Sequence, residues 1–217
     1  MKPISRFQYI THTVEGYSHA ELAEQACKGG ADWVQLRVKN ISQDELLKIA
    51  FQTKDVCREY NACFIINDHL QIVKRVGADG VHLGRKDFPA SEARKMLGKD
   101  YIIGGSANSF SDVVENAKAG LDYTGIGPFR FTFTKEKLNP VLGFTGIEKI
   151  VEECRKNKIS IPLIAIGGIG EADIPHLMEC GIHGIAVSSG VNLASDKRKK
   201  TEEILRELFK VNLKKKK

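Results

Sequence analysis

The chain has 217 residues, of which 42% are hydrophobic and 28% are charged, an ordinary composition for a globular protein. This composition argues against a disordered or collagen-like chain, and no apolar run approaches the ~20 residues that a membrane span needs. Much of the formal net charge of +6 lies in the lysine-rich runs 197–200 and 214–217, which are typical of solvated surface. We therefore expect neither nucleic acid nor a membrane as a partner.

Short apolar runs alternate with longer helical patterns along the whole chain. In chain order, the eight runs expected to form strands are 7–11, 33–37, 63–67, 80–83, 101–106, 123–127, 162–166 and 184–188. Strands that are apolar on both faces and separated by helices are typical of a parallel sheet. An open doubly wound sheet would also alternate, but eight units in one chain favour an α/β fold with a single-domain (β/α)8 TIM barrel.

The helical segments between these runs carry start and stop signals. Ser42 and Glu45 have the spacing of a capping box, and Ser111 is expected to open the helix that runs to Ala119. Left-handed glycines are expected where helices end, at Gly29, Gly77, Gly120 and Gly181. Three helix ends have similar sequences: Gly-Ala-Asp at 30–32 and at 77–79, and Gly-Ile-His at 181–183.

Five cysteines are scattered through the chain without a C-x-x-C pair, which favours reduced thiols over disulfides or a zinc site. Residues 1–11 lack the long apolar stretch of a signal peptide, so we expect a cytoplasmic protein. The pattern predicts one catalytic domain over residues 1–213 and a lysine-rich tail at 214–217. The oligomeric state stays open and includes a homo-oligomer.

Functional side chains of such a barrel lie at the C-terminal ends of its strands. At the end of the second strand, Gln35, Arg37 and Lys39 alternate to one side, toward the expected barrel mouth. Two cations there can grip a diphosphate, although a polar strand edge explains the same pattern.

The third and fourth strands are each followed by a carboxylate, Asp68 directly after Asn67, and Asp87 three residues after Gly84. Two carboxylates on adjacent loops suit Mg²⁺, which takes oxygen ligands and keeps positions open for substrate phosphates. A helix N-cap is the competing interpretation for each aspartate. His82, inside the fourth strand, is expected to be a hydrogen-bonded barrel residue rather than a general base.

The segment 125–135 is a long glycine-bearing connection and a candidate lid, with Thr132 and Thr134 as hydroxyl donors and Lys135 as an anion contact. The loops after the seventh and eighth strands form the usual phosphate site of this fold, and here they contain Gly168 and Ser188. The spacing therefore predicts two anion sites on opposite sides of one mouth.

Five motifs, in order along the chain, resemble the thiamine phosphate synthase family, which is related to the thiazole tautomerases. They are Gln-Leu-Arg-x-Lys at 35–39, Ile-Asn-Asp at 66–68, Gly-Val-His-Leu-Gly at 80–84 with Asp87, Gly-Pro at 127–128, and Thr-x-Thr-Lys at 132–135. The resemblance implies a Mg²⁺-dependent transferase. Such an enzyme joins 4-amino-2-methyl-5-(diphosphooxymethyl)pyrimidine to a thiazole phosphate, or to its carboxylated form, in a dissociative substitution that gives thiamine phosphate and pyrophosphate.

The resemblance also implies a role for each site residue. Asp68 and Asp87 would bind Mg²⁺, while Arg37, Lys39 and Lys135 would act catalytically by stabilising the leaving pyrophosphate. The pyrimidine diphosphate would be held by Gln35, Arg37, Lys39, Asn67, Ser106 and Lys135. The thiazole phosphate would be received by Thr132, Thr134, Gly168, Val187 and Ser188.

The chain departs from the family pattern at several positions. Val38 stands in place of a glutamate, Arg85 in place of a glutamine, and 129–131 in place of Val-Phe-Pro, where Arg130 is a candidate additional anion contact. A tautomerase would need a histidine where Asn108 stands, so Asn108 is expected only to line the mouth and to tolerate alanine. The same fold could also serve a noncatalytic phosphate-binding barrel or a sugar-phosphate epimerase.

Overall fold

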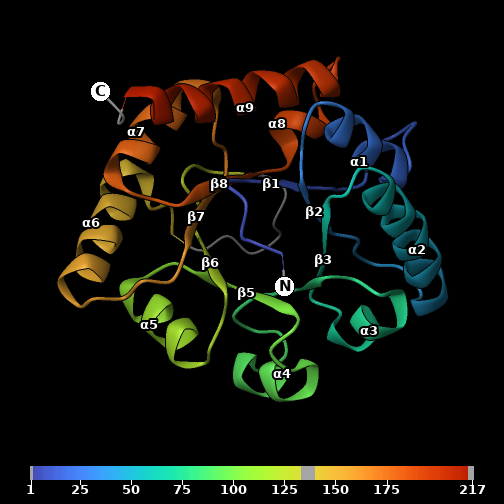
Figure 1. Cartoon of the computed structure of the whole chain (residues 1–217), viewed down its shortest axis with the longest axis horizontal. Helices are drawn as coiled ribbons and strands as arrows, with labels where there is room; N and C mark the ends of the chain where they lie inside the picture. The colour runs from blue at the N-terminus through green and yellow to red at the C-terminus, as the bar shows by residue number, and fades with distance from the viewer. Residues whose placement is uncertain (1, 133–139, 215–217) are drawn as a thin grey trace.

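The computed structural model describes residues 2–132 and 140–214, with side chains in the last helix described up to residue 210. In this part of the chain, eight parallel strands form one closed barrel in the order of the sequence, from β1 to β8. Figure 1 shows the helices in a ring around these strands. The predicted (β/α)8 barrel is confirmed.

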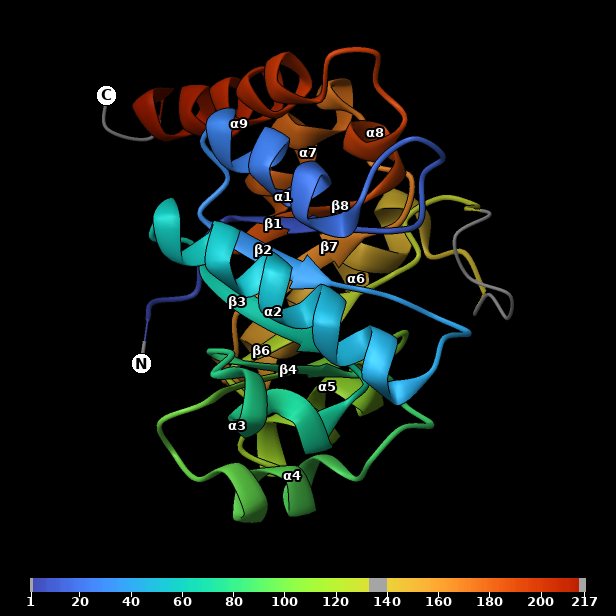
Figure 2. The ribbon, with the colours of Figure 1, turned by 90° about the vertical axis from the view of Figure 1, so that its right-hand side faces the viewer.

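The strands end within one residue of their predicted limits, because each apolar run stops where a polar loop begins. Their bounds are β1 Phe7–Ile10, β2 Trp33–Leu36, β3 Cys63–Asn67, β4 Gly80–Leu83, β5 Ile102–Ala107, β6 Tyr123–Ile126, β7 Leu163–Ile166 and β8 Gly184–Val187. Since all eight are parallel, their C-terminal ends share one end of the barrel, which we call the mouth. Figure 2 shows the chain's N-terminus at one end and the loop after β2, at the mouth, at the other.

The helices fill the connections between strands. Their bounds are α1 His19–Lys28, α2 Gln43–Glu59, α3 Val73–Val76, α4 Ala90–Leu97, α5 Phe110–Lys118, α6 Gly143–Lys156, α7 Ile174–Cys180, α8 Ser189–Asn192 and α9 Lys197–Lys214, with 3-10 turns at Leu70–Ile72 and Glu171–Asp173. The last helix, α9, packs against α1 and α7 (Figure 1). Throughout the described ranges, no helix combines the length and the apolar character needed to cross a membrane.

The helix starts confirm one predicted cap and correct another. The Ser42 side chain accepts a hydrogen bond from the N–H of Glu45 and forms the expected capping box of α2. The prediction of a start at Ser111 is wrong, because α5 begins at Phe110. Ser109 has the extended backbone of an N-cap, and its hydroxyl accepts from the N–H of Asp112 at 3.2 Å.

The helix ends confirm three of the four left-handed glycines. Gly77, Gly120 and Gly181 have φ angles of 69°, 73° and 104°. Gly29 does not follow the prediction, since its φ is −81° and the next residue, Gly30, takes the left-handed conformation with φ 97°. The reversal after α1 therefore falls one residue later than expected.

An aspartate stands just before β4, in the helix end at 77–79, and another stands just before β6. The carboxylate of Asp79, before β4, accepts a hydrogen bond from the N–H of Phe64 at 2.8 Å, and Asp122, before β6, accepts from the N–H of Ile103 at 2.7 Å. Each aspartate thus ties the start of one strand to the start of its neighbour. This end of the barrel, opposite the mouth, serves stability, whereas the active site of such barrels lies at the mouth.

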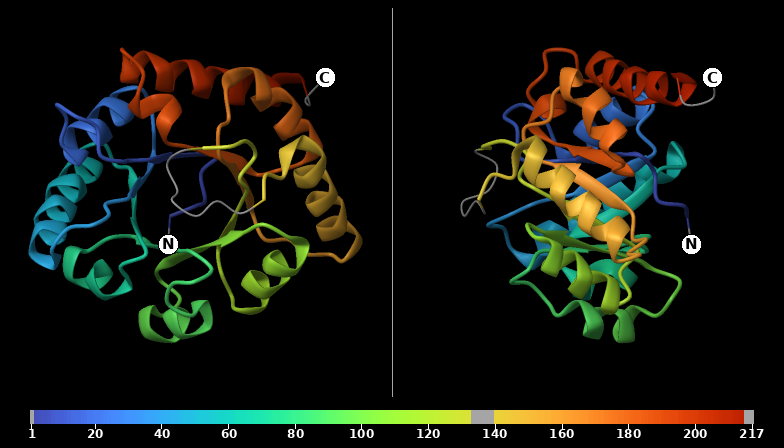
Figure 3. Two further views of the ribbon diagram at one scale, coloured as in Figure 1. Left: turned by 180° about the vertical axis from the view of Figure 1, so that it is seen from behind. Right: turned by 90° about the vertical axis from the view of Figure 1, so that its left-hand side faces the viewer.

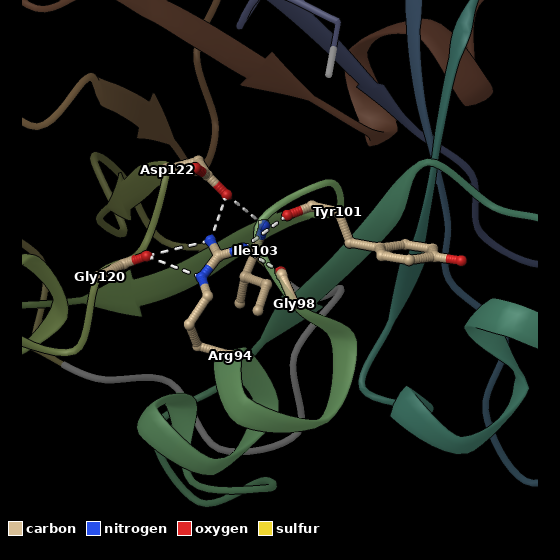
Figure 4. Close-up of polar contacts among 6 residues, drawn as sticks. All are labelled: Arg94, Gly98, Tyr101, Ile103, Gly120 and Asp122. Atoms are coloured by element: carbon tan, nitrogen blue, oxygen red, sulfur yellow. Dashed lines mark hydrogen bonds and ion pairs between the residues drawn. The ribbon is translucent and has the colours of Figure 1, made fainter.

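Arg94 in the last turn of α4 extends this arrangement (Figure 4). Its guanidinium donates to the carbonyls of Gly98 and Tyr101, both at 2.8 Å, and to that of Gly120. It also pairs with Asp122 at 2.6 Å. One arginine therefore satisfies carbonyls at the ends of two helices and holds the carboxylate that joins β5 to β6.

Side chains fill the interior of the barrel. Trp33 and Tyr123 meet edge to face, with ring centroids 4.8 Å apart and planes at 79°. Gly104 makes room for Tyr123, because a Cβ at this position would lie 2.0 Å from the ring. The interior cluster consists of Ile10, Trp33, Cys63, Ile65, Ile102, Tyr123, Ile164 and Ala186. The mouth therefore opens above a packed floor and not into a pore.

Candidate active site

A hydrogen-bonded network of polar side chains crosses the barrel just above this floor. Gln35 donates to Gln8 at 3.0 Å, and Gln8 donates to the Tyr123 hydroxyl at 3.1 Å. The Tyr123 hydroxyl lies 2.9 Å from Nδ1 of His82, whose Nε2 lies 3.0 Å from the Ser106 hydroxyl. These hydrogen bonds connect Gln35 to Ser106, two residues to which the family resemblance gives the same substrate. They confirm His82 as a hydrogen-bonded barrel residue.

The two predicted metal ligands lie together at the mouth. The carboxyl groups of Asp68 and Asp87 are within hydrogen-bonding distance of each other, and Lys39 lies 3.1 Å from Asp68. Asp87 also accepts a hydrogen bond from the N–H of Gly84 at 2.6 Å. Neither aspartate caps a helix, so the N-cap interpretation is wrong for both.

The pKa values of the two aspartates move apart. Burial raises the pKa of Asp87 to about 6, and the hydrogen bond and negative charge of Asp68 act in the same direction. For Asp68, burial also raises the pKa, but the hydrogen bond from Asp87 and the charge of Lys39 outweigh it, so the net shift is downward. These opposite shifts are those expected for two carboxylates held close together.

This donor set fits a hard divalent cation. Both carboxylates are oxygen ligands, and a cation between them would offset the repulsion of their negative charges. The described residues contain no group of three or more histidine, cysteine, aspartate or glutamate side chains placed to hold a metal. A cation here would take its other ligands from water and substrate phosphates, which is the way Mg²⁺ is usually held.

A second cluster lies across the mouth, at the end of β8. Nδ1 of His12 lies 3.0 Å from the Ser188 hydroxyl, and the amide of Asn192 donates to the same hydroxyl at 3.2 Å. Burial, and then the nearby Arg37, lower the pKa of His12, which favours the neutral imidazole. The Ser188 hydroxyl is therefore held by two partners, next to the buried Val187.

Arg37 stands between the two clusters. It follows β2, and its N–H donates to the hydroxyl of Thr11 at 3.2 Å, which places it beside the end of β1. Its charge acts on His12, the partner of Ser188, whereas Lys39 two residues later contacts Asp68. The two cations after β2 thus lie near different groups at the mouth, Arg37 near His12 and Lys39 beside Asp68.

The segment after β6 meets the turn after β7 at the mouth, and Figure 3 shows it in yellow at that end of the barrel. Gly168 has a φ of 65°, and a Cβ there would lie 2.9 Å from Cβ of Arg130, so the position favours glycine. Thr132 is half-buried. Thr134 and Lys135 lie outside the described residues.

Two side chains have roles that differ from the sequence-based expectation. The amide of Asn108 donates to the carbonyls of Gly127 and Pro140, both at 2.9 Å, so it joins the two ends of the segment after β6 and does more than line the mouth. The guanidinium of Arg130 pairs with Asp173, so it is already occupied and is not the additional anion contact that was expected. Both roles depend on partners far away in the sequence.

A family model described as thiamine monophosphate synthase matches residues 8–191, a span that contains every residue predicted to bind substrate or metal. The chain belongs to this family. The thiamine-phosphate synthase of Phocaeicola vulgatus is 48% identical over 198 residues, which cover 91% of this chain and 95% of that relative. The thiamine-phosphate synthase of Flavobacterium johnsoniae is 47% identical over 197 residues, 90% of this chain and 92% of the relative.

A solved structure agrees with these relatives. Thiamine phosphate pyrophosphorylase from Pyrococcus furiosus superimposes with a TM-score of 0.83 and 34% identity, covering 95% of this chain and 96% of that one. The resemblance inferred from the five motifs is confirmed, and the chain is a transferase of the thiamine-phosphate synthase type.

Proposed function

We propose that the mouth binds 4-amino-2-methyl-5-(diphosphooxymethyl)pyrimidine beside the Asp68–Asp87 pair and a thiazole phosphate beside Ser188, and couples them to thiamine phosphate. The observation that carries this proposal is the paired carboxylates at the end of β3 and in the loop after β4, with Lys39 3.1 Å from Asp68. The negative charge of a diphosphate complements the positive charge of Lys39 and of a bound metal ion. In this proposal the mouth would hold the two anions in separate places.

Asp68 and Asp87 would hold Mg²⁺, whose charge would offset that of the departing pyrophosphate. Burial and the neighbouring carboxylate raise the pKa of Asp87 to about 6, and a bound cation would favour its ionised form. Asn67, at the end of β3 and 8% exposed, supplies a neutral amide next to the pair.

The reaction we propose is a dissociative substitution. The bond between the pyrimidine methylene carbon and the diphosphate oxygen breaks, and its electron pair leaves with pyrophosphate. Arg37 would hold the leaving group with a forked contact, and Lys39 and Lys135 with point charges. The thiazole nitrogen then donates its lone pair to the methylene carbon, so no covalent enzyme intermediate forms. Catalysis rests on positioning and charge stabilisation.

The thiazole phosphate would lie against the turn at Gly168 and the start of α8. Gly168, Val187 and Ser188 would receive the phosphate, with the Ser188 hydroxyl oriented by His12 and Asn192. Thr132 and Thr134 would contribute hydroxyl groups from the segment after β6. The preorganised Ser188 hydroxyl supports this assignment, because its partners leave it a fixed direction.

We also propose that the protein works in the cytoplasm as one catalytic domain over residues 1–213, acting on small molecules alone. The five cysteines are free thiols, which supports a reducing compartment. A homo-oligomer is compatible with the barrel.

The experiment that distinguishes a synthase from a tautomerase or a binding protein supplies the substrates one at a time. With the thiazole phosphate alone, a synthase gives negligible isomerisation, whereas a tautomerase turns it over without the pyrimidine. With both substrates and Mg²⁺, a synthase forms thiamine phosphate, which is converted to its fluorescent oxidised derivative for detection. Binding of both substrates without turnover favours a noncatalytic barrel, and rapid isomerisation without coupling contradicts the proposed function.

A further inference from the structure

Arg130 runs along the turn that follows β7. Its backbone N–H donates to the carbonyl of Gly167 at 2.8 Å, and its guanidinium donates to the carbonyl of Gly168 at 3.1 Å. The same guanidinium forms a forked ion pair with Asp173, in which Nη2 lies 2.6 Å from Oδ1 and Nη1 contacts Oδ2. Arg130 is therefore bonded to the turn at its start and, through Asp173, at its end.

Asp173 is itself fixed to the turn. Its Oδ2 accepts a hydrogen bond from the N–H of Gly170 at 2.8 Å, and its side chain is only 14% exposed. The Arg130 guanidinium lies over the ring of the buried Phe129, with Cζ 4.5 Å from the ring centroid. Packing on one side and the carboxylate on the other leave this arginine one orientation.

The ion pair also removes a charge conflict. A phosphate bound at the Gly168 turn would lie near the Asp173 carboxylate, and unpaired negative charge there would oppose binding. The forked contact neutralises the carboxylate with matched geometry, which a lysine cannot reproduce. The side chain of Arg130 is 53% exposed, so the pair contributes little to the stability of the fold.

We propose that Arg130 is a positioning residue, which acts through Asp173 to hold the 167–170 turn in the shape that receives the thiazole phosphate. This inference rests on the proposed function, because that function assigns Gly168 to the thiazole phosphate. It goes further by giving a role to a departure from the family pattern. A specific loss of affinity for one of the two substrates is the expected signature.

The test compares Arg130→Met, Asp173→Asn and the double variant in steady-state assays with one substrate saturating. Arg130→Met raises KM for the thiazole phosphate about tenfold and leaves KM for the pyrimidine diphosphate within about twofold. Its midpoint of thermal unfolding shifts by less than about 3 °C. The double variant is no worse than the single variants, because all three lose the same pair.

Two further variants complete the comparison, one conservative and one a control away from the mouth. Arg130→Lys keeps the charge without the fork, so it recovers part of the affinity, and it replaces Arg130→Met if that variant does not fold. Arg58→Met is the matched control, because it breaks an exposed ion pair with Asp55 within α2, away from the mouth, and leaves both KM values unchanged. A thiazole phosphate KM that stays within about twofold of native in Arg130→Met, or KM values that rise together for both substrates, would overturn the proposal.

Titration calorimetry with the thiazole phosphate alone separates this inference from the proposed function. A native chain that binds the thiazole phosphate without any turnover contradicts the proposed function, and the role of Arg130 is then decided by an about tenfold rise in Kd in Arg130→Met. A native chain that does not bind the thiazole phosphate contradicts both.

Discussion

Nε2 of His82 lies 3.0 Å from the hydroxyl of Ser106, and Nδ1 of the same ring lies 2.9 Å from the hydroxyl of Tyr123. The imidazole therefore joins a residue assigned to the pyrimidine diphosphate to the side chain that fills the barrel. Because both ring nitrogens have partners, we interpret His82 as the group that orients Ser106. A general base would instead need a ring nitrogen aimed at substrate.

His82→Phe should lower kcat/KM for the pyrimidine diphosphate about tenfold, because the Ser106 hydroxyl loses the group that orients it. Ser106→Ala should give a similar loss, and the double variant should lose little more. Initial rates of the three variants test this relationship. Losses that multiply in the double variant would show that the two side chains act independently.

Asn108→Asp should slow coupling about tenfold, because a carboxylate oxygen replaces the N–H₂ donor between the carbonyls of Gly127 and Pro140. Asn108→Ala should show a smaller loss in the same direction. Asn157→Asp makes the same chemical change at the end of α6, where the amide donates to the carbonyl of Glu153, and should leave the rate near native. Native rates in both Asn108 variants would show that this bridge is unimportant for turnover.

The stability of the protein should fall as the pH drops from about 6.5 toward 4, in part because of His19. Burial, and then the nearby His12, lower the pKa of His19 to about 4, while the imidazole lies 2.8 Å from the hydroxyl of Thr11. A histidine whose folded pKa is depressed stabilises the fold above its unfolded pKa and loses this contribution as the pH falls. Urea midpoints from pH 7 to 4 should therefore decline less steeply for His19→Asn, and identical slopes would contradict the assignment.

Arg94→Met should lower the free energy of unfolding by about 2–4 kcal/mol, because it leaves several carbonyls and Asp122 without their partner (Figure 4). Arg58→Met, at an exposed ion pair within α2, should cost less than about 1 kcal/mol. Urea unfolding of both variants gives the comparison. Equal losses would mean that the network around Arg94 contributes no more than an exposed pair.

The sequence predicted the barrel well because its strands are buried on both faces. β3 and β4 agree with their predicted bounds, since each apolar run ends abruptly, at Asp68 and at Gly84. The closeness of the two carboxylates was predictable for a related reason: Asp68 and Asp87 follow neighbouring parallel strands, whose ends must meet at the mouth. Position along a strand is information that a sequence carries directly.

The remaining features depend on partners that only the closed barrel brings together. Asn108 lies 32 residues from Pro140, and Arg130 lies 43 residues from Asp173. Gln8, which completes the polar chain to Tyr123, looks like one polar residue in an apolar run. The cap at Ser109 was missed for a local reason, since two serines two residues apart offered competing starts. The ligand-binding and catalytic roles of the site residues, including Thr134 and Lys135, stay predictions.

The proposed role of the Asp68–Asp87 pair is to support metal-dependent coupling. It is tested most directly by measuring thiamine phosphate and pyrophosphate together while Mg²⁺ is removed by a chelator and then restored. The native chain should form the two products in equal amounts, only with the metal. Asp68→Asn and Asp87→Asn should each be slower by about 10²-fold or more, whereas Asp55→Asn in α2 should be unaffected. Turnover that survives chelation, or near-native rates of both variants at limiting Mg²⁺, would contradict the account.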